Sequence, residues 1–80
     1  MAEAQKEMFG QWFRRIRHQR QLTQEKAARE LFIESPSTLA RWEDGRALPR
    51  ANQIRKLTLW GRISPKAMLE MLEMSGSVNA

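Results

Sequence analysis

The side chains of this chain that can do chemistry are mostly cationic. Among 80 residues, 14 Lys and Arg stand against 9 Asp and Glu, a formal net charge of +5. His18 is the single histidine and cysteine is absent, so the residues offer neither a metal site nor a catalytic triad. Paired carboxylates, a glycine-rich phosphate loop and a nucleophile–base pair are also missing from the sequence. We therefore expect no enzyme, metal or cofactor, but a domain that binds a polyanion, either nucleic acid or an anionic membrane surface.

The positive charge lies in two blocks. Residues 1–20 carry five basic and two acidic side chains, and residues 35–62 carry six and two, whereas residues 63–80 are slightly acidic. A membrane-surface helix would instead carry one continuous basic face, which only residues 13–20 approach, and a solvated helix face explains that run equally well. No apolar run reaches the roughly 20 residues of a membrane span, and no signal peptide is visible. We expect a soluble, cytoplasmic domain.

Short helices must position these cations. Apolar residues recur at i, i+3, i+4 and i+7 from Phe9 to Ile16, which predicts a first helix over about residues 5–19. Gly10 inside that helix predicts the close approach of another helix. Capping and stop signals predict four more helices. They begin at Thr23, at Ser35-Pro36, at Pro49 or Arg50, and at Ser64-Pro65, with stops at Gly45 for the third and Gly61 for the fourth.

The stretch from Phe9 to Pro49 resembles the helix-turn-helix of the Cro and lambdoid-repressor (XRE-like) family. The resemblance rests on Phe9-Gly10, Phe13-Arg14, Ile16-Arg17, Arg20, Leu22-Thr23-Gln24-Glu25, Ala28, Leu31, Ser35, Ser37-Thr38-Leu39, Arg41-Trp42-Glu43, Gly45-Arg46 and Pro49. It implies an all-α, five-helix bundle of the lambda-repressor-like DNA-binding type. The domain would span residues 1–74, with the helix-turn-helix unit at about 23–45 and a frayed tail at 75–80.

The sequence departs from that family at the turn. Family members usually carry a glycine near Phe32, and the turn here is about one residue longer. Ala27 stands where a leucine is common, so Phe32 or a tryptophan is expected to refill the lost core volume. Trp42 is expected in the core.

The third helix carries the expected base readers. The major groove admits one α-helix, whose N-terminal side chains reach the base edges. Short side chains at Ser37 and Thr38 allow close approach, Ala40 offers a methyl group, and Arg41 can reach a guanine. By analogy with the family, Ser37 and Arg41 are the main readers, and Pro36 is either an apolar edge or only a helix starter.

Five side chains are expected to contact phosphates: Gln24, Arg46, Arg50, Arg14 and Arg20. For each arginine the alternative is a solvated surface charge, and for Arg14 and Arg20 the two interpretations are equally open. The resemblance further implies that Arg17 and Glu43 form a structural ion pair between the first and third helices.

The fifth helix is the expected partner surface. The residues predicted at a homodimer interface are Trp60, Met68, Met71 and Leu72, although some of these methionines must close the core of their own domain.

These features predict a sequence-specific, double-stranded DNA-binding transcriptional regulator of bacterial or phage type. We expect a nucleoid-associated repressor that binds a palindromic operator as a homodimer. Because the sequence ends at Ala80, a Cro-like or small accessory repressor is expected rather than one with a sensor domain. The alternative is an antitoxin or other small interaction protein with the same fold, which would bind a toxin partner.

Overall fold

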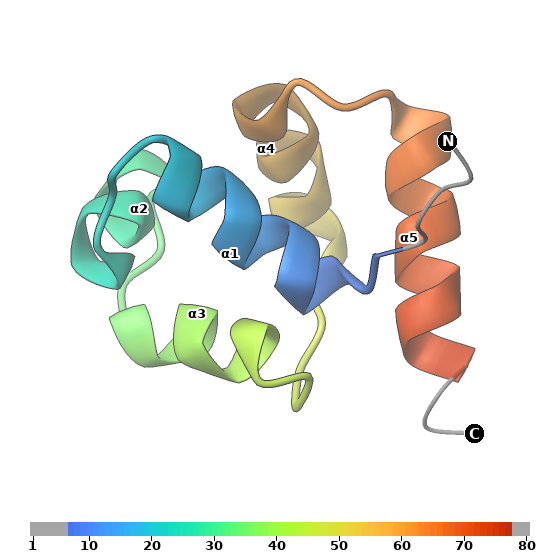
Figure 1. The fold of residues 1–80 in the computed structure, drawn as a ribbon, viewed down its shortest axis with the longest axis horizontal. Coiled ribbons are helices and arrows are strands. Elements are labelled where there is room, and N and C mark those ends of the chain that lie inside the picture. Colours follow the sequence, from blue (N-terminus) through green and yellow to red (C-terminus); the bar gives the residue numbers. More distant parts are fainter. Residues whose placement is uncertain (1–6, 78–80) are drawn as a thin grey trace.

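The computed structural model describes residues 7–77. Within this range the chain forms five helices. The helices are α1 (Phe9–Gln19), α2 (Gln24–Glu30), α3 (Pro36–Glu43), α4 (Ala51–Gly61) and α5 (Pro65–Ser77). No strand occurs within residues 7–77. In Figure 1, α3 lies below α1, and α5 stands at the side of the molecule away from α2. This architecture confirms the all-α, five-helix bundle.

Side-chain caps start three of these helices at the predicted residues. Thr23 Oγ1 accepts a hydrogen bond from the Lys26 amide at 3.1 Å, and Ser35 Oγ accepts one from the Ser37 amide at 3.3 Å. Ser64 Oγ does the same for Ala67 at 3.1 Å. Each cap satisfies an amide that has no partner within its helix.

Two helix ends were predicted wrongly in different ways. The first helix begins at Phe9, because residues 7 and 8 are not helical, whereas residues 1–6 lie outside the described part. The fifth helix runs through Ser77, so the tail expected from residue 75 does not begin there; residues 78–80 lie outside the described part. One contact joins the start of α1 to the last turn of α5: Ser75 Oγ accepts a hydrogen bond from the Phe9 amide at 2.8 Å and donates to the Met71 carbonyl at 2.9 Å.

Two glycines close helices in different ways. Gly45 follows α3 with a φ of +78°, the left-handed conformation that the sequence predicts. Gly61 is the last residue of α4, but Arg62 takes the left-handed position. A side chain at residue 61 would overlap the indole of Trp12, so the packing there requires a glycine.

Aromatic rings from three helices build the core around α1. Phe9 and Phe13 meet the ring of Trp42 edge-on, with centroids 5.5 and 5.4 Å apart. Trp60 stacks on Phe13 at 5.1 Å. The buried apolar residues are Phe9, Trp12, Phe13, Ala27, Ala28, Leu31, Leu39, Trp42, Leu57, Met68 and Met71. Trp42 is therefore a core residue, as predicted.

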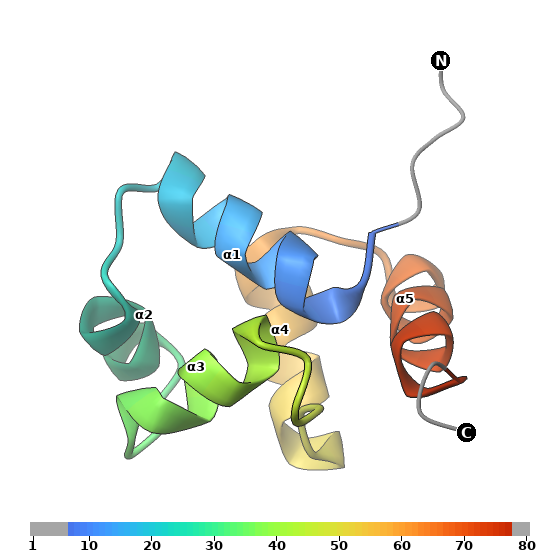
Figure 2. The same cartoon turned by 60° about the horizontal axis from the view of Figure 1, so that its bottom comes forward.

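The turn between α2 and α3 differs from the expectation. Phe32 adopts a φ of +57°, the conformation that a glycine favours, and 82% of its surface is exposed. It therefore does not refill the volume left by Ala27. Lys56 Nζ lies 5.5 Å from the centre of the Phe32 ring. The two views of the fold show that this turn joins α2 and α3 at the end of the molecule opposite α5 (Figures 1 and 2).

Candidate nucleic-acid interface

One face of α3 is attached to the core and the other faces outward. Leu39 and Trp42 are buried, and α3 packs on α1 and α2. Ser37 and Arg41, four residues apart and thus one above the other on the helix, are exposed. Within residues 7–77, Arg41 forms no ion pair, so its five N–H donors are available to a ligand.

The other expected base readers lie beside this outward face. Pro36, Thr38 and Ala40 are all half-buried. Ser37 Oγ lies 2.6 Å from Ser35 Oγ, the oxygen that caps α3, so one hydrogen bond of the Ser37 hydroxyl is used at the start of the helix. A hydroxyl can make further hydrogen bonds, which leaves Ser37 able to contact a base.

A polar groove of about 530 Å³ runs between α3 and the start of α4. It brings together Arg41, expected to reach a base, and Arg50, expected to reach a phosphate. Asn52 and Gln53, in the first turn of α4, also line it. Sequence reasoning missed these two amides, although their place within three residues after Arg50 was a usable signal.

The carboxylate of Glu43 is the centre of a buried polar network. Arg17 donates from Nε to Oε2 at 2.7 Å and from Nη2 to Oε1 at 2.9 Å, so the two residues expected to pair form a two-bond ion pair. Arg17 also donates from Nη1 to the Leu22 carbonyl at 2.9 Å. The Glu43 side chain is only 1% exposed. The pair thereby ties α1 to the end of α3.

Two expected phosphate contacts belong to the same network. Gln24 Nε2 donates to Glu43 Oε1 at 3.2 Å, and Arg14 Nε donates to it at 3.4 Å. Burial raises the pKa of Glu43, but hydrogen bonds from Arg17 and Gln24 and the charge of Arg17 outweigh it and hold that pKa below its usual value. The carboxylate therefore stays ionised and keeps its donors in place.

The remaining expected phosphate contacts have partners of different kinds. Arg46 Nη2 donates to Asp44 Oδ2 at 2.9 Å on the surface. The guanidinium of Arg20 lies 4.8 Å from the centre of the Trp60 ring. The side chain of Arg50 is exposed and forms no ion pair with any described residue.

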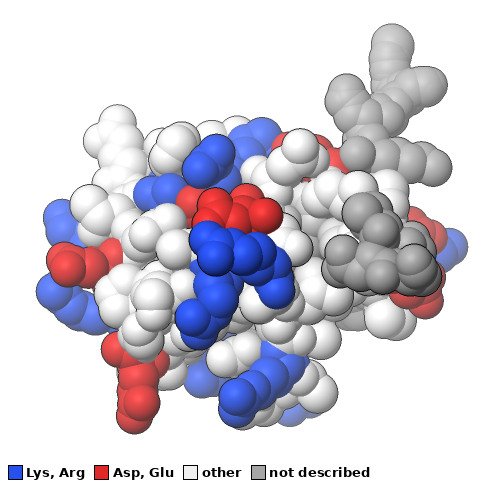
Figure 3. Space-filling model, turned by 90° about the horizontal axis from the view of Figure 1, so that it is seen from below, with Lys and Arg blue, Asp and Glu red and all other residues white. Residues whose placement is uncertain are grey.

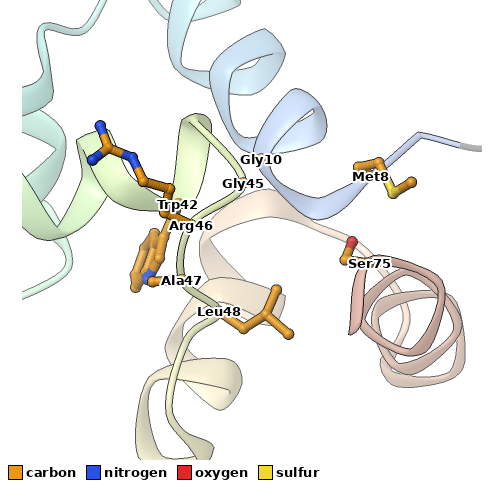
Figure 4. A pocket seen from close by; sticks show the side chains of 8 residues that line it. All are labelled: Met8, Gly10, Trp42, Gly45, Arg46, Ala47, Leu48 and Ser75. Atoms are coloured by element: carbon orange, nitrogen blue, oxygen red, sulfur yellow. The ribbon is translucent and has the colours of Figure 1, made fainter. Parts of the chain in front are cut away.

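The end of α3 lies against α1, and the loop that follows it lies against α5. Gly10 lies so close to α3 that a side chain there would overlap the Trp42 carbonyl oxygen and lie 3.1 Å from Glu43 Cα, which confirms the predicted close approach of another helix. In the loop, Leu48 Cδ1 lies 3.7 Å from where a side chain of Gly76 on α5 would begin. Figure 4 shows Leu48 projecting toward the Ser75 side of a hollow of about 360 Å³, whereas Arg46 points away from it toward α3. The loop can therefore present Arg46 beside the outward face of α3.

Lys and Arg side chains gather on the face that carries α3. In the view from below, they form a cluster over α3 and the following loop, next to acidic side chains, and a second group lies along the lower edge (Figure 3). The exposed arginines of this segment are Arg41, Arg46 and Arg50. The face can attract and hold a polyanion.

The four residues expected at a dimer interface pack within the chain instead. Met68 and Met71 are buried in the core, and Leu72 is half-buried against it. Trp60 is also half-buried, and its Nε1 donates to Glu30 Oε1 at 2.9 Å. The inner face of α5 therefore closes the domain and is not free for a second copy.

A match to a family model agrees with this geometry. Among the described residues, no helix has the length and apolar character that crossing a membrane requires, and no group of three His, Cys, Asp or Glu side chains is placed to hold a metal. Searches of curated proteins and of solved structures found no match. A family model described as a helix-turn-helix domain matches residues 8–58, which include α1, α2, α3 and most of α4. The chain thus belongs to the helix-turn-helix domain family, whose fold serves DNA binding.

Proposed function

We propose that the chain is a sequence-specific regulator of transcription that binds double-stranded DNA and represses as a homodimer on a palindromic operator. The observation that carries this proposal is the exposed pair Ser37 and Arg41 on the outer face of α3. Leu39 and Trp42 hold the inner face of the same helix in the core. A helix supported in this way can enter the major groove with its first turns against the base edges.

Base reading and phosphate binding fall to different arginines in this proposal. Arg41 has no ion-pair partner among the described residues and reaches a base edge from α3. Arg46 and Arg50 flank the loop after α3 and hold the DNA backbone, Arg46 by exchanging Asp44 for a phosphate. Pro36, Thr38 and Ala40 supply the edges of the reading surface.

Arg14, Arg20 and Gln24 have a secondary role in this proposal. Arg14 and Gln24 already donate to Glu43, and the Arg20 guanidinium already lies over Trp60, but each side chain keeps further N–H donors for a phosphate. The proposed function requires no cofactor, and its location is the nucleoid in the cytoplasm.

Selection of bound sequences from a random duplex pool tests the function. The expected result is a palindrome whose half-sites lie about 10 base pairs apart, or a multiple of that spacing. An asymmetric single half-site would contradict the homodimer. No enrichment at all would contradict sequence-specific DNA binding and favour the alternative of a small interaction protein with a toxin partner.

Two arginine variants test the assignment of the contacts. Arg41→Ala should flatten the preference at one base pair in each half-site, because a bidentate base contact is worth about 1–3 kcal/mol of discrimination. Arg50→Ala should weaken all sequences alike and lower the slope of log affinity against log salt by about one unit. Lys66→Ala is the matched control, since Lys66 is exposed in the first turn of α5, at the end of that helix far from α3 (Figure 1). If Arg41→Ala leaves the ranking of sequences unchanged, α3 is not the reading element.

A further inference from the structure

The turn between α2 and α3 contains a residue in an unfavourable backbone conformation. Phe32 has a φ of +57°, in the left-handed region where a residue with a Cβ atom is strained and glycine is not. Its amide donates to the Arg29 carbonyl at 3.2 Å, and the Ile33 amide donates to the Ala28 carbonyl at 2.8 Å. The exposed Phe32 side chain does not anchor the turn in the core. Such a conformation persists only where surrounding contacts hold it.

One side of α4 supplies these contacts. Lys56 Nζ donates a hydrogen bond to the Leu31 carbonyl at 3.3 Å and lies over the Phe32 ring. Within residues 7–77, no other group donates to that carbonyl. Trp60 lies one helical turn further along α4, and its Nε1 donates to Glu30 Oε1 at 2.9 Å. Two neighbouring side chains of α4 thus hold the end of α2 and the turn that follows it.

The charge of Lys56 suits this position. Leu31 is the C-terminal cap of α2, and the carbonyl groups at that end of a helix carry partial negative charge. The face of an aromatic ring also attracts a cation. Lys56 forms no ion pair with a described residue, so its ammonium group is free for both contacts. The next residue, Leu57, is buried in the core and keeps this part of α4 in place.

We propose that Lys56 is a positioning residue for DNA recognition, because the turn that it holds fixes the start of α3. Ser35, which caps α3, follows Phe32 by three residues, and Ser37 lies in the first turn of that helix. Phe32 also lines the same groove as Arg41. Movement of the turn therefore displaces the reading surface, although Lys56 itself touches no base. The inference rests on DNA binding by α3 in the proposed function and adds a residue of α4 that supports it.

Hydrogen exchange of the full chain without DNA tests the turn by itself. Lys56→Met keeps an unbranched side chain but removes its charge and its donors. It should lower the exchange protection of the Ile33 amide about tenfold, the effect of losing one hydrogen bond from a charged donor. Adding Phe32→Gly should restore most of that protection, since glycine adopts the left-handed conformation without strain. Lys66→Met, the same change on the exposed first turn of α5, is the matched control and should leave the protection unchanged.

Binding to the duplex selected from the random pool, measured well below the melting temperature, tests the consequence for DNA. Lys56→Met should weaken binding about tenfold without changing the slope of log affinity against log salt. Loss of a phosphate contact would instead lower that slope by about one unit. Lys56→Arg, which keeps a cationic donor, and the double variant Lys56→Met, Phe32→Gly should both bind nearly as tightly as the wild type. Lys66→Met should bind like the wild type.

Three results would overturn the inference. They are unchanged Ile33 protection in Lys56→Met, lower protection with unchanged affinity, and an affinity loss accompanied by a lower salt slope, which would make Lys56 a phosphate contact. The proposed function fails separately. A wild type that binds no duplex would refute that function and the positioning role with it, whereas the exchange measurement would still decide whether Lys56 holds the turn.

Discussion

Replacing Glu43 by alanine should destabilise the fold far more than replacing Glu7, although both glutamates accept two hydrogen bonds from one arginine. Arg15 donates to Glu7 from Nε at 2.9 Å and from Nη2 at 2.8 Å, which closely matches the geometry of Arg17 with Glu43. The pairs differ in burial: the arginine and glutamate side chains are 47% and 31% exposed in the first pair, but 11% and 1% in the second. Glu43 also accepts hydrogen bonds from Gln24 and Arg14, so the comparison measures burial together with these extra bonds.

The expected magnitudes follow from what each substitution leaves behind. Glu43→Ala leaves the Arg17 charge buried with only the Leu22 carbonyl as a partner, and breaking such a pair costs about 3–5 kcal/mol. Glu7→Ala leaves Arg15 in water, at a cost of about 0.2–1 kcal/mol. In a domain of this size 1 kcal/mol lowers the melting temperature by about 4–8 °C. Glu43→Ala should therefore lower it by at least about 12 °C, and Glu7→Ala by less than about 8 °C.

Thermal and urea unfolding at pH 7, followed by far-ultraviolet circular dichroism, measure both values. The double variant Arg17→Met, Glu43→Met should recover much of the loss, because no unpaired charge then remains buried. Equal, small shifts for Glu43→Ala and Glu7→Ala would refute the reasoning. So would a double variant as unstable as Glu43→Ala, because the loss would then not come from a stranded charge.

Two further predictions concern acid and close packing. Because the pKa of Glu43 is lower in the folded state, its contribution is complete above about pH 5 and is lost as the pH falls below the ordinary carboxyl value of about 4.3. The melting temperature should thus fall more between pH 7 and pH 3 for the wild type than for Glu43→Gln, and equal losses would contradict the assignment. Gly10→Ala should lower the melting temperature, since its methyl group meets the Trp42 carbonyl, at an overpacking cost of about 1–3 kcal/mol. Gly76→Ala should raise it, because the nearest atom, Leu48 Cδ1, lies at an ordinary 3.7 Å and alanine favours a helix by up to about 1 kcal/mol; shifts of the same sign would contradict this contrast.

The sequence by itself determined the helices and the outward side of α3. Caps such as Thr23 and Ser35 act on amides two or three residues away, so their effect is visible in the local sequence. The helical period likewise puts Ser37 and Arg41 on one side of α3 and Leu39 and Trp42 on the other. The family match over residues 8–58 agrees with that analysis.

Only the tertiary structure decided which side chains are left for partners. Gln24 and Arg14 turn to Glu43, and α5 directs Met68 and Met71 inward but Leu69 outward. On α5 apolar residues lie on more than one side, so the helical period alone could not tell the core face from the exposed one. The Phe9–Ser75 hydrogen bond, between residues 66 positions apart, likewise joins two helix ends that local signals did not predict. Such choices depend on distances between segments remote in sequence, and those distances exist only once the helices have packed.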